Sequence, residues 1–310
     1  MRIIQVFWSK PAFDLMSVRY NGGWLERKYH YMSLCLSCLL LKRQYHEVEL
    51  ITDEYGKQLL IGEFHLPYTS VKVELNKFDN YHRDLGIILK LSCFESQQLP
   101  FIYVDNDLFV CDRFDEKILS APLIVQKEMD LDAPSLYGFL DYIQKNVVQG
   151  REQPVTRNNG TVELEKGYDL SIFGGCDTPF ISAFARESLA VLNKNIRFLN
   201  ENIDSEIRDN SKFFYTAHPF DQMNSMIESY FLTSSARRHG KRVECVTELP
   251  DLGKTRGNLL LKMRPGSGYI HIVHENKRKL EICNQLEYQL REQFPDQYYT
   301  ILSGLREFRI

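Results

Sequence analysis

The chain has 310 residues, of which 44% are hydrophobic and 25% charged, with a formal net charge of −3. This composition is typical of a folded globular protein; it argues against intrinsic disorder, and the slight acidic excess argues against non-specific nucleic-acid binding, which requires a basic surface. No apolar run reaches the ~18 residues that a membrane span needs, and the N-terminal sequence lacks a signal peptide, so we expect a cytoplasmic protein without a membrane span.

The first third of the chain alternates strand and helix patterns. Nearly continuous apolar runs predict buried strands, and apolar residues at helical spacing predict the helices between them. The predicted strands are residues 2–9, 48–52, 70–74 and 101–104, and the predicted helices are 24–43, 57–61 and 84–97. This order predicts an α/β fold with a doubly wound, mostly parallel sheet flanked by helices.

The remaining two thirds are less regular. Short apolar runs predict strands at 122–126, 168–173, 242–245 and 269–273. Helical spacing predicts helices at 133–148, 179–193, 219–238 and 278–294, while 149–166 reads as an exposed excursion and 250–268 as a mobile loop. We therefore expect a helical second half.

Two aspartates follow the strand predicted at 101–104. Because side chains alternate along an extended chain, Asp105 and Asp107 lie on the same side of it. Two carboxylates at the carboxyl end of a buried strand repel each other unless a cation lies between them, and Mn²⁺ or Mg²⁺ would suit oxygen ligands. The alternative is that both aspartates only cap the next turn.

An apolar strand, Asp-x-Asp and a second apolar pair resemble the signature of GT-A glycosyltransferases, and the layout is most similar to their glycogenin-like and galactosyltransferase-like families. The resemblance implies a GT-A fold, a nucleotide-sugar donor (most commonly a UDP-sugar) and Mn²⁺ or Mg²⁺. It also implies one domain over residues 1–310, in which 1–126 bind the donor and 127–310 form the acceptor side with a C-terminal metal-site segment. Asn106, between the two aspartates, is then assigned to the donor site.

Three further segments resemble the same families, and the resemblance gives each a role. Lys90, on the helix before the motif strand, would hold the donor diphosphate, although a lysine is more often a solvated surface residue. Gly174 and Gly175 would border the sugar, with Asp177 close behind, unless they only form a tight turn. The segment at 221–224 resembles an Asp-Gln-x-x-Asn motif with one residue fewer, which makes Asp221 and Gln222 catalytic candidates.

The C-terminal segment resembles a His-x-Gly-x-x-Lys motif in which Asn276 replaces the glycine. The resemblance makes His274 the third metal ligand and Lys277 a diphosphate-binding residue. A strand-end histidine with a solvated lysine is an equally good description. His271 shares a strand face with Val273, which favours a side chain pointing into the core.

The ends of the first two strands are candidates for binding the nucleotide base. Phe7, Trp8 and Ser9 leave the first strand, and Asp53 follows the second. An aromatic side chain here either stacks on a base or plugs the core.

The reaction implied by the resemblance is sugar transfer to an acceptor hydroxyl on a glycan, a lipid-linked glycan or a protein. If the configuration is retained, Asp221 or Gln222 lines the reacting face; if it is inverted, Asp177 or Asp221 is the general base. Two alternatives remain: a nucleotide-sugar-binding module without turnover, and a metal-dependent nucleotidyltransferase.

Overall fold

The computed structural model describes residues 1–10, 21–83, 85–130, 157–158, 161–162, 166–209, 224, 226–246 and 263–306, with the backbone alone for 157–158, 161–162 and 194–209. These residues form two compact units. The first comprises Met1–Asp79, Phe101–Leu119 and Thr247–Ile310, and the second comprises Asn80–Pro100 and Ser120–Val246. The C-terminal segment thus belongs to the same compact unit as the first strands.

The first unit contains four parallel strands in the order β4-β1-β2-β3. They are β1 (Arg2–Phe7), β2 (Val48–Thr52), β3 (Ser70–Val73) and β4 (Phe101–Val104). Every residue of β2 and β4 is buried, as expected for strands covered on both faces. The predicted α/β class and the mostly parallel strands are confirmed.

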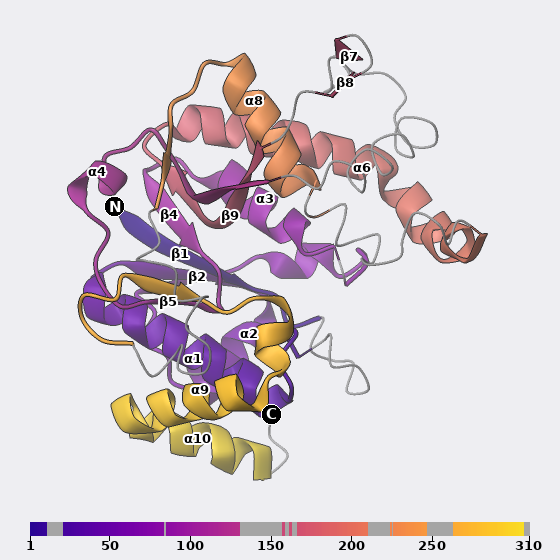
Figure 1. Ribbon diagram of the computed structural model, residues 1–310. Helices are drawn as coiled ribbons and strands as arrows, with labels where there is room; N and C mark the ends of the chain where they lie inside the picture. Colours follow the sequence, from indigo (N-terminus) through magenta and orange to yellow (C-terminus); the bar gives the residue numbers. More distant parts are fainter. Residues whose placement is uncertain are drawn as a thin grey trace. The chain divides into compact units, whose positions relative to one another are not determined.

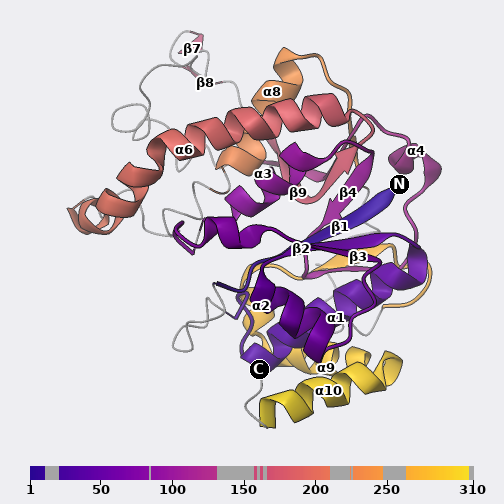
Figure 2. The same cartoon turned by 180° about the vertical axis from the view of Figure 1, so that it is seen from behind.

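Three helices of this unit pack against one another: α1 (Arg27–Gln44), α9 (Leu280–Gln293) and α10 (Pro295–Arg306), which lie side by side in both views (Figures 1 and 2). Two-thirds of α1 is buried, because the helix lies between the sheet strands and the C-terminal helices. The sequence did not predict α10. The shorter elements are α2 (Glu54–Lys57), η3 (Gln58–Glu63), η4 (Leu75–Phe78) and α4 (Glu116–Leu119).

A small antiparallel ribbon completes the first unit. Its strands are β5 (Leu108–Val110) and β11 (Tyr269–His271), and the short helix η8 (His274–Arg278) follows. The ribbon joins residues that are about 160 positions apart in the sequence, and it places the C-terminal segment beside the Asp-x-Asp turn.

The second unit contains three strands in the order β10-β6-β9. β6 (Leu123–Asp130) pairs antiparallel with β9 (Lys166–Gly175) and parallel with β10 (Val243–Cys245). The helices α3 (Ile87–Ser96) and α6 (Thr178–Asp209) pack together, as both views show (Figures 1 and 2).

The remaining elements of this unit are η5 (Met226–Phe231), α8 (Leu232–Arg238) and a hairpin of β7 (Arg157–Asn158) and β8 (Thr161–Val162). The helix predicted at 133–148 and most of the loop predicted at 250–268 lie outside the described residues. Within the described part of the chain, no helix has the length and apolar character that crossing a membrane requires.

Candidate metal centre

A tight turn carries the two motif aspartates from β4 into β5. The Leu108 N–H donates to the Asp105 carbonyl at 3.3 Å, which closes the turn. The Asn106 side-chain amide donates to the Val6 carbonyl at 2.7 Å, which ties the turn to the end of β1. The Tyr103 hydroxyl donates to the Asp105 carboxylate. Asn106 therefore holds the turn through its side chain. The donor-binding role that the resemblance assigned to Asn106 stays a prediction.

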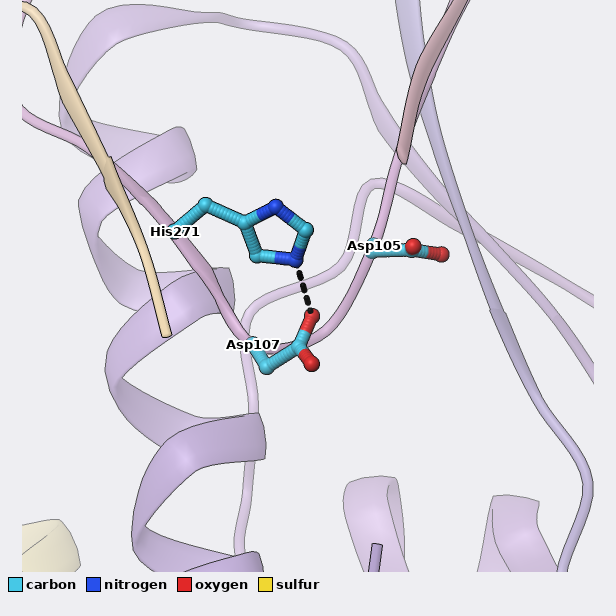
Figure 3. Close-up of side chains that lie close together, drawn as sticks. All are labelled: Asp105, Asp107 and His271. Carbon is cyan, nitrogen blue, oxygen red and sulfur yellow. Dashed lines mark ion pairs between the residues drawn. The ribbon is translucent and has the colours of Figure 1, made fainter. Parts of the chain in front are cut away.

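The ribbon brings a histidine to this turn. His271 is paired with Leu108 across β5 and β11, and the Ile272 N–H donates to the Asp107 carbonyl at 3.2 Å. The His271 Nε2 atom lies 3.3 Å from Asp107 Oδ1. As Figure 3 shows, the His271 ring and the Asp107 carboxylate point toward each other, with Asp105 on the adjoining stretch of chain. One ligand atom from each of these three residues lies within 4.8 Å of the others.

Lys277 supplies a positive charge at the same carboxylate. Its Nζ lies 2.5 Å from Asp107 Oδ2 and donates to the Gly22 carbonyl at 2.8 Å. Burial by itself raises the pKa of Asp107, but Lys277 and His271 outweigh burial, so that the pKa lies well below its usual value. Asp107 is therefore a carboxylate at neutral pH, which is the form that binds a metal ion.

The chemistry of this donor set fits a divalent cation. Two carboxylates and an imidazole converge, and the neutral imidazole nitrogen is a good ligand for Mn²⁺, while carboxylate oxygens suit both Mn²⁺ and Mg²⁺. Among the described residues, this is the one group of three acidic, histidine or cysteine side chains close enough to hold a metal. Asp105, Asp107 and His271 would hold the ion.

The histidine of this cluster differs from the one that the sequence favoured. The motif resemblance predicted His274 as the metal ligand, and strand alternation predicted that His271 points into the core. In the structure His271 lies beside Asp107, with 7% of its side chain exposed, and His274 lies outside the cluster. His274 begins η8 with φ +51° and is exposed. The β5–β11 pairing explains the difference, because it aligns His271 and not His274 with the turn. Lys277 pairs with Asp107, and its binding of the diphosphate stays a prediction.

The carboxyl ends of β1 and β2 lie side by side, since Phe7 pairs with Thr52; nucleotide binding at this edge stays a prediction. The carboxylate of Asp53 accepts hydrogen bonds from the Ser9 N–H (2.8 Å), the Ser9 hydroxyl (2.7 Å) and the Gly56 N–H (2.7 Å). Phe7 and Trp8 are buried beside them, with 4% and 5% exposed. Asp53 is thus buried and satisfied by protein donors, so that it stabilises this edge and starts α2. The Trp8 indole N–H has no hydrogen-bond partner among the described residues.

Lys90 lies on α3, in the second unit, and pairs with Glu228 of η5 at 3.0 Å. Asn224 lies near the same helix, and its side-chain oxygen accepts a hydrogen bond from the Ile87 N–H at 3.3 Å. That bond satisfies one of the free N–H groups at the start of α3. Both residues therefore stabilise α3, and a donor-binding role for Lys90 stays a prediction.

Gly174 and Gly175 end β9 next to the start of β6. Gly175 has φ +135°, and a Cβ atom there would lie 2.3 Å from the Pro122 carbonyl oxygen. The backbone after it stays close, because the Asp177 N–H donates to the same carbonyl at 2.9 Å. The close approach of two backbone segments therefore requires glycine at position 175.

We expect Gly175→Ala to destabilise the protein by about 2 kcal/mol or more, because the new methyl group must displace the chain at Pro122 and the residue keeps an unfavourable φ. Urea unfolding of the variant and the wild type measures the change. Gly240→Ala is a matched control, since Gly240 also has a positive φ but open space around its Cβ position. Equal losses in both variants would show that φ alone is responsible.

Asp177 begins α6 in the second unit. Its carboxylate accepts from the Phe180 N–H at 3.2 Å and pairs with Lys241 at 2.7 Å. Burial raises the pKa of Asp177, but the hydrogen bonds from Lys241 and Phe180 lower it by more than burial raises it. The pKa of Asp177 is therefore below its usual value. A general base works best with a pKa near the working pH, so this arrangement suits a helix cap better than a base. The other catalytic candidates, Asp221 and Gln222, lie outside the described residues.

His30 interacts electrostatically with Lys277 and Asp107 of the candidate metal centre, and no sequence motif predicted this position. Its ring lies between those of Phe7 and Tyr31, with ring centroids 6.2 and 6.1 Å away, and its Nδ1 atom is buried. Burial lowers the pKa of His30 from 6.5 to about 3, and the charge of Lys277 adds to this shift. His30 is therefore neutral in the folded protein.

This pKa predicts acid sensitivity. Below pH 6.5 the unfolded chain binds a proton at His30 that the folded protein does not, so the free energy of unfolding falls as the pH falls toward about 3. We expect His30→Phe, which retains an aromatic ring, to lose less stability than the wild type between pH 7 and pH 5 in urea unfolding. His46→Gln, a change at an exposed histidine, should follow the wild type. An unchanged slope for His30→Phe would contradict the assignment.

No curated protein matches the sequence. Among solved structures, the chain is similar to the apo form of mouse xyloside xylosyltransferase 1, with 12% sequence identity, a TM-score of 0.36, and coverage of 87% of this chain and 96% of that chain. It is also similar to an active-site mutant of LgtC, with 10% identity, a TM-score of 0.33, and coverage of 63% and 64%. Residues 1–304 match the model of DUF6734, a family of unknown function, and the chain belongs to that family.

Proposed function

We propose that this protein is a metal-dependent glycosyltransferase that moves a sugar from a nucleotide-sugar donor to an acceptor hydroxyl. The proposed donor is a UDP-sugar. One observation carries the proposal: Asp105, Asp107 and His271 converge at the carboxyl end of a parallel strand, beside Lys277. In parallel α/β sheets, this edge is where ligands bind. The motif order along the sequence supports the same reaction class.

Some residues of the site would bind the metal ion, and others would bind the diphosphate or the base. Asp105, Asp107 and His271 would hold Mn²⁺ or Mg²⁺, and the ion would supply Lewis-acid chemistry. Lys277, which lies against the Asp107 carboxylate, would neutralise the remaining phosphate charge as a point charge. Phe7 and Trp8 form the apolar wall for the base, while Ser9 and Asp53 fix the shape of that wall through their hydrogen bonds.

The test is thermal unfolding of the full chain with UDP, GDP, CDP and ADP and their common sugar conjugates, each with and without Mn²⁺. A ligand present at ~100 times its dissociation constant adds ~2.7 kcal/mol of stability. We expect UDP or a UDP-sugar to stabilise the protein only when Mn²⁺ is present. Slow hydrolysis of the nucleotide-sugar donor, detected by chromatography, then distinguishes an enzyme from a binding module.

The other outcomes identify the alternatives. Stabilisation by nucleoside triphosphates but not by diphosphates would support a nucleotidyltransferase. Binding of a diphosphate-sugar with no hydrolysis and no transfer would support the binding module. No stabilisation by any nucleotide, with or without Mn²⁺, would refute the proposal. We also propose that the acceptor is a glycan, a lipid-linked glycan or a protein. Asp221 and Gln222 remain the proposed catalytic residues.

A further inference from the structure

Two buried serines of α1 form hydrogen bonds to the backbone of the Asp-x-Asp turn. The Ser33 hydroxyl donates to the Asn106 carbonyl at 3.1 Å, and the Ser37 hydroxyl donates to the Leu108 carbonyl at 2.7 Å. These carbonyls belong to the residues immediately before and after Asp107. Both serines are almost completely buried, with 1% and 0% exposed.

Ser33 and Ser37 lie one helical turn apart on the same face of α1, because residues four positions apart in a helix are neighbours. From this face one serine reaches a carbonyl in the tight turn and the other reaches a carbonyl at the start of β5. A helical serine ordinarily bonds to a carbonyl of its own helix, so two consecutive turns with outward bonds form a specific link between α1 and the turn.

A second layer orients Ser37. The Gln5 side-chain amide donates to the Ser37 hydroxyl at 2.9 Å, and the Tyr68 hydroxyl donates to the Gln5 side-chain oxygen at 2.8 Å. Gln5 is completely buried in β1. Because Gln5 occupies the acceptor side of the hydroxyl, the Ser37 proton is directed at Leu108. The chain Tyr68–Gln5–Ser37 leaves no ambiguity in the direction of these bonds.

We propose that Ser33 and Ser37 are positioning residues that hold the backbone on both sides of Asp107 and thereby place its carboxylate for metal binding. The inference rests on the proposed metal-dependent function. The serines act through the backbone of Asn106 and Leu108. Groups that orient metal ligands typically change metal affinity by 10–100-fold when they are removed.

The test measures the affinity for Mn²⁺ alone by electron paramagnetic resonance of the free ion, using the full chain. We expect Ser33→Ala and Ser37→Ala each to weaken binding, and the double variant to weaken it by about 10–100-fold. Thr233→Val is the matched control, since Thr233 is buried in the second unit and its hydroxyl donates to the Ser229 carbonyl at 2.6 Å. It should lower the melting temperature without changing the affinity for Mn²⁺.

Equal Mn²⁺ affinity in the double variant and the wild type would overturn the inference. If the double variant does not fold, Ser33→Ala alone decides. Hydrogen exchange of the Ile272 amide is a second readout that requires no metal, because this amide donates to the Asp107 carbonyl. We expect faster exchange at Ile272 in the serine variants and not in Thr233→Val.

The two proposals fail in different ways. If the wild type binds no Mn²⁺, the metal-dependent function is wrong, and the Ile272 amide still decides whether the serines position Asp107. If the wild type binds Mn²⁺ and the serine variants bind it equally well, only the positioning role is wrong.

Discussion

Asp107→Asn should weaken Mn²⁺ binding by about 1,000-fold, which corresponds to about 4 kcal/mol, more than the loss caused by removing a residue that only orients a ligand. The substitution keeps the size of the side chain but removes the charge that His271 and Lys277 face at 3.3 and 2.5 Å. Calorimetric titration with Mn²⁺, and then with UDP in the presence of Mn²⁺, measures both steps. Since the metal links the protein to the diphosphate, UDP binding should be lost together with Mn²⁺ binding.

Asp115→Asn is the matched control for this change. Asp115 belongs to the same unit, and its carboxylate accepts a hydrogen bond from the Ile118 N–H at 2.8 Å, a role that asparagine also fills. This variant should bind Mn²⁺ and UDP as the wild type does. Retention of wild-type Mn²⁺ affinity in Asp107→Asn would refute the metal centre and leave the aspartates as residues of a turn.

Lys277→Met should destabilise the metal-free protein by about 2–3 kcal/mol, because it leaves the Asp107 carboxylate without its closest cation in a largely buried setting. The side chains of Lys277 and Asp107 are only 15% and 20% exposed. Added Mn²⁺ should restore more stability to this variant than to the wild type, since the ion supplies the missing charge. Urea unfolding with and without Mn²⁺ tests both expectations.

Two further results complete the Lys277 experiment. Lys28→Met, which removes a more exposed ion pair with Glu287 at 3.3 Å, should cost less than about 1 kcal/mol and should not respond to Mn²⁺. UDP should bind Lys277→Met more weakly than the wild type when Mn²⁺ is saturating. Unchanged UDP affinity would exclude Lys277 from diphosphate binding while leaving the metal centre intact.

The contrast between His271 and His274 shows where local sequence patterns are insufficient. Both histidines follow an apolar stretch, and alternation along the strand directed His271 toward the core. The side that counts as the core depends on the partner strand. Since β11 pairs with β5, His271 lies opposite Leu108, and its side chain comes within 3.3 Å of the neighbouring Asp107 carboxylate. A non-local pairing of this kind leaves no mark on the sequence around either histidine.

Ser33 and Ser37 illustrate the same limit for polar residues in a helix. In the sequence they are two small residues within an apolar helical run, with nothing to distinguish them from residues that merely fill space. Their role arises from the packing of α1 under a turn about 70 residues later in the chain. The alignment of the two serines with the carbonyls on either side of Asp107 is visible only in three dimensions.

The sequence by itself determined the α/β class, the positions of β2 and β4, and the pair Asp105 and Asp107 at the end of a buried strand, because these features follow from local apolar patterns and alternation. It also predicted that Lys277 would serve the same site. Only the tertiary structure decided that His271 is the third potential ligand, that Asp53 and Asp177 are engaged by neighbouring donors, and that Gly175 is required by the Pro122 backbone. The physical reason is that each of these roles depends on a partner distant in sequence, and such partners are brought together only by strand pairing and helix packing.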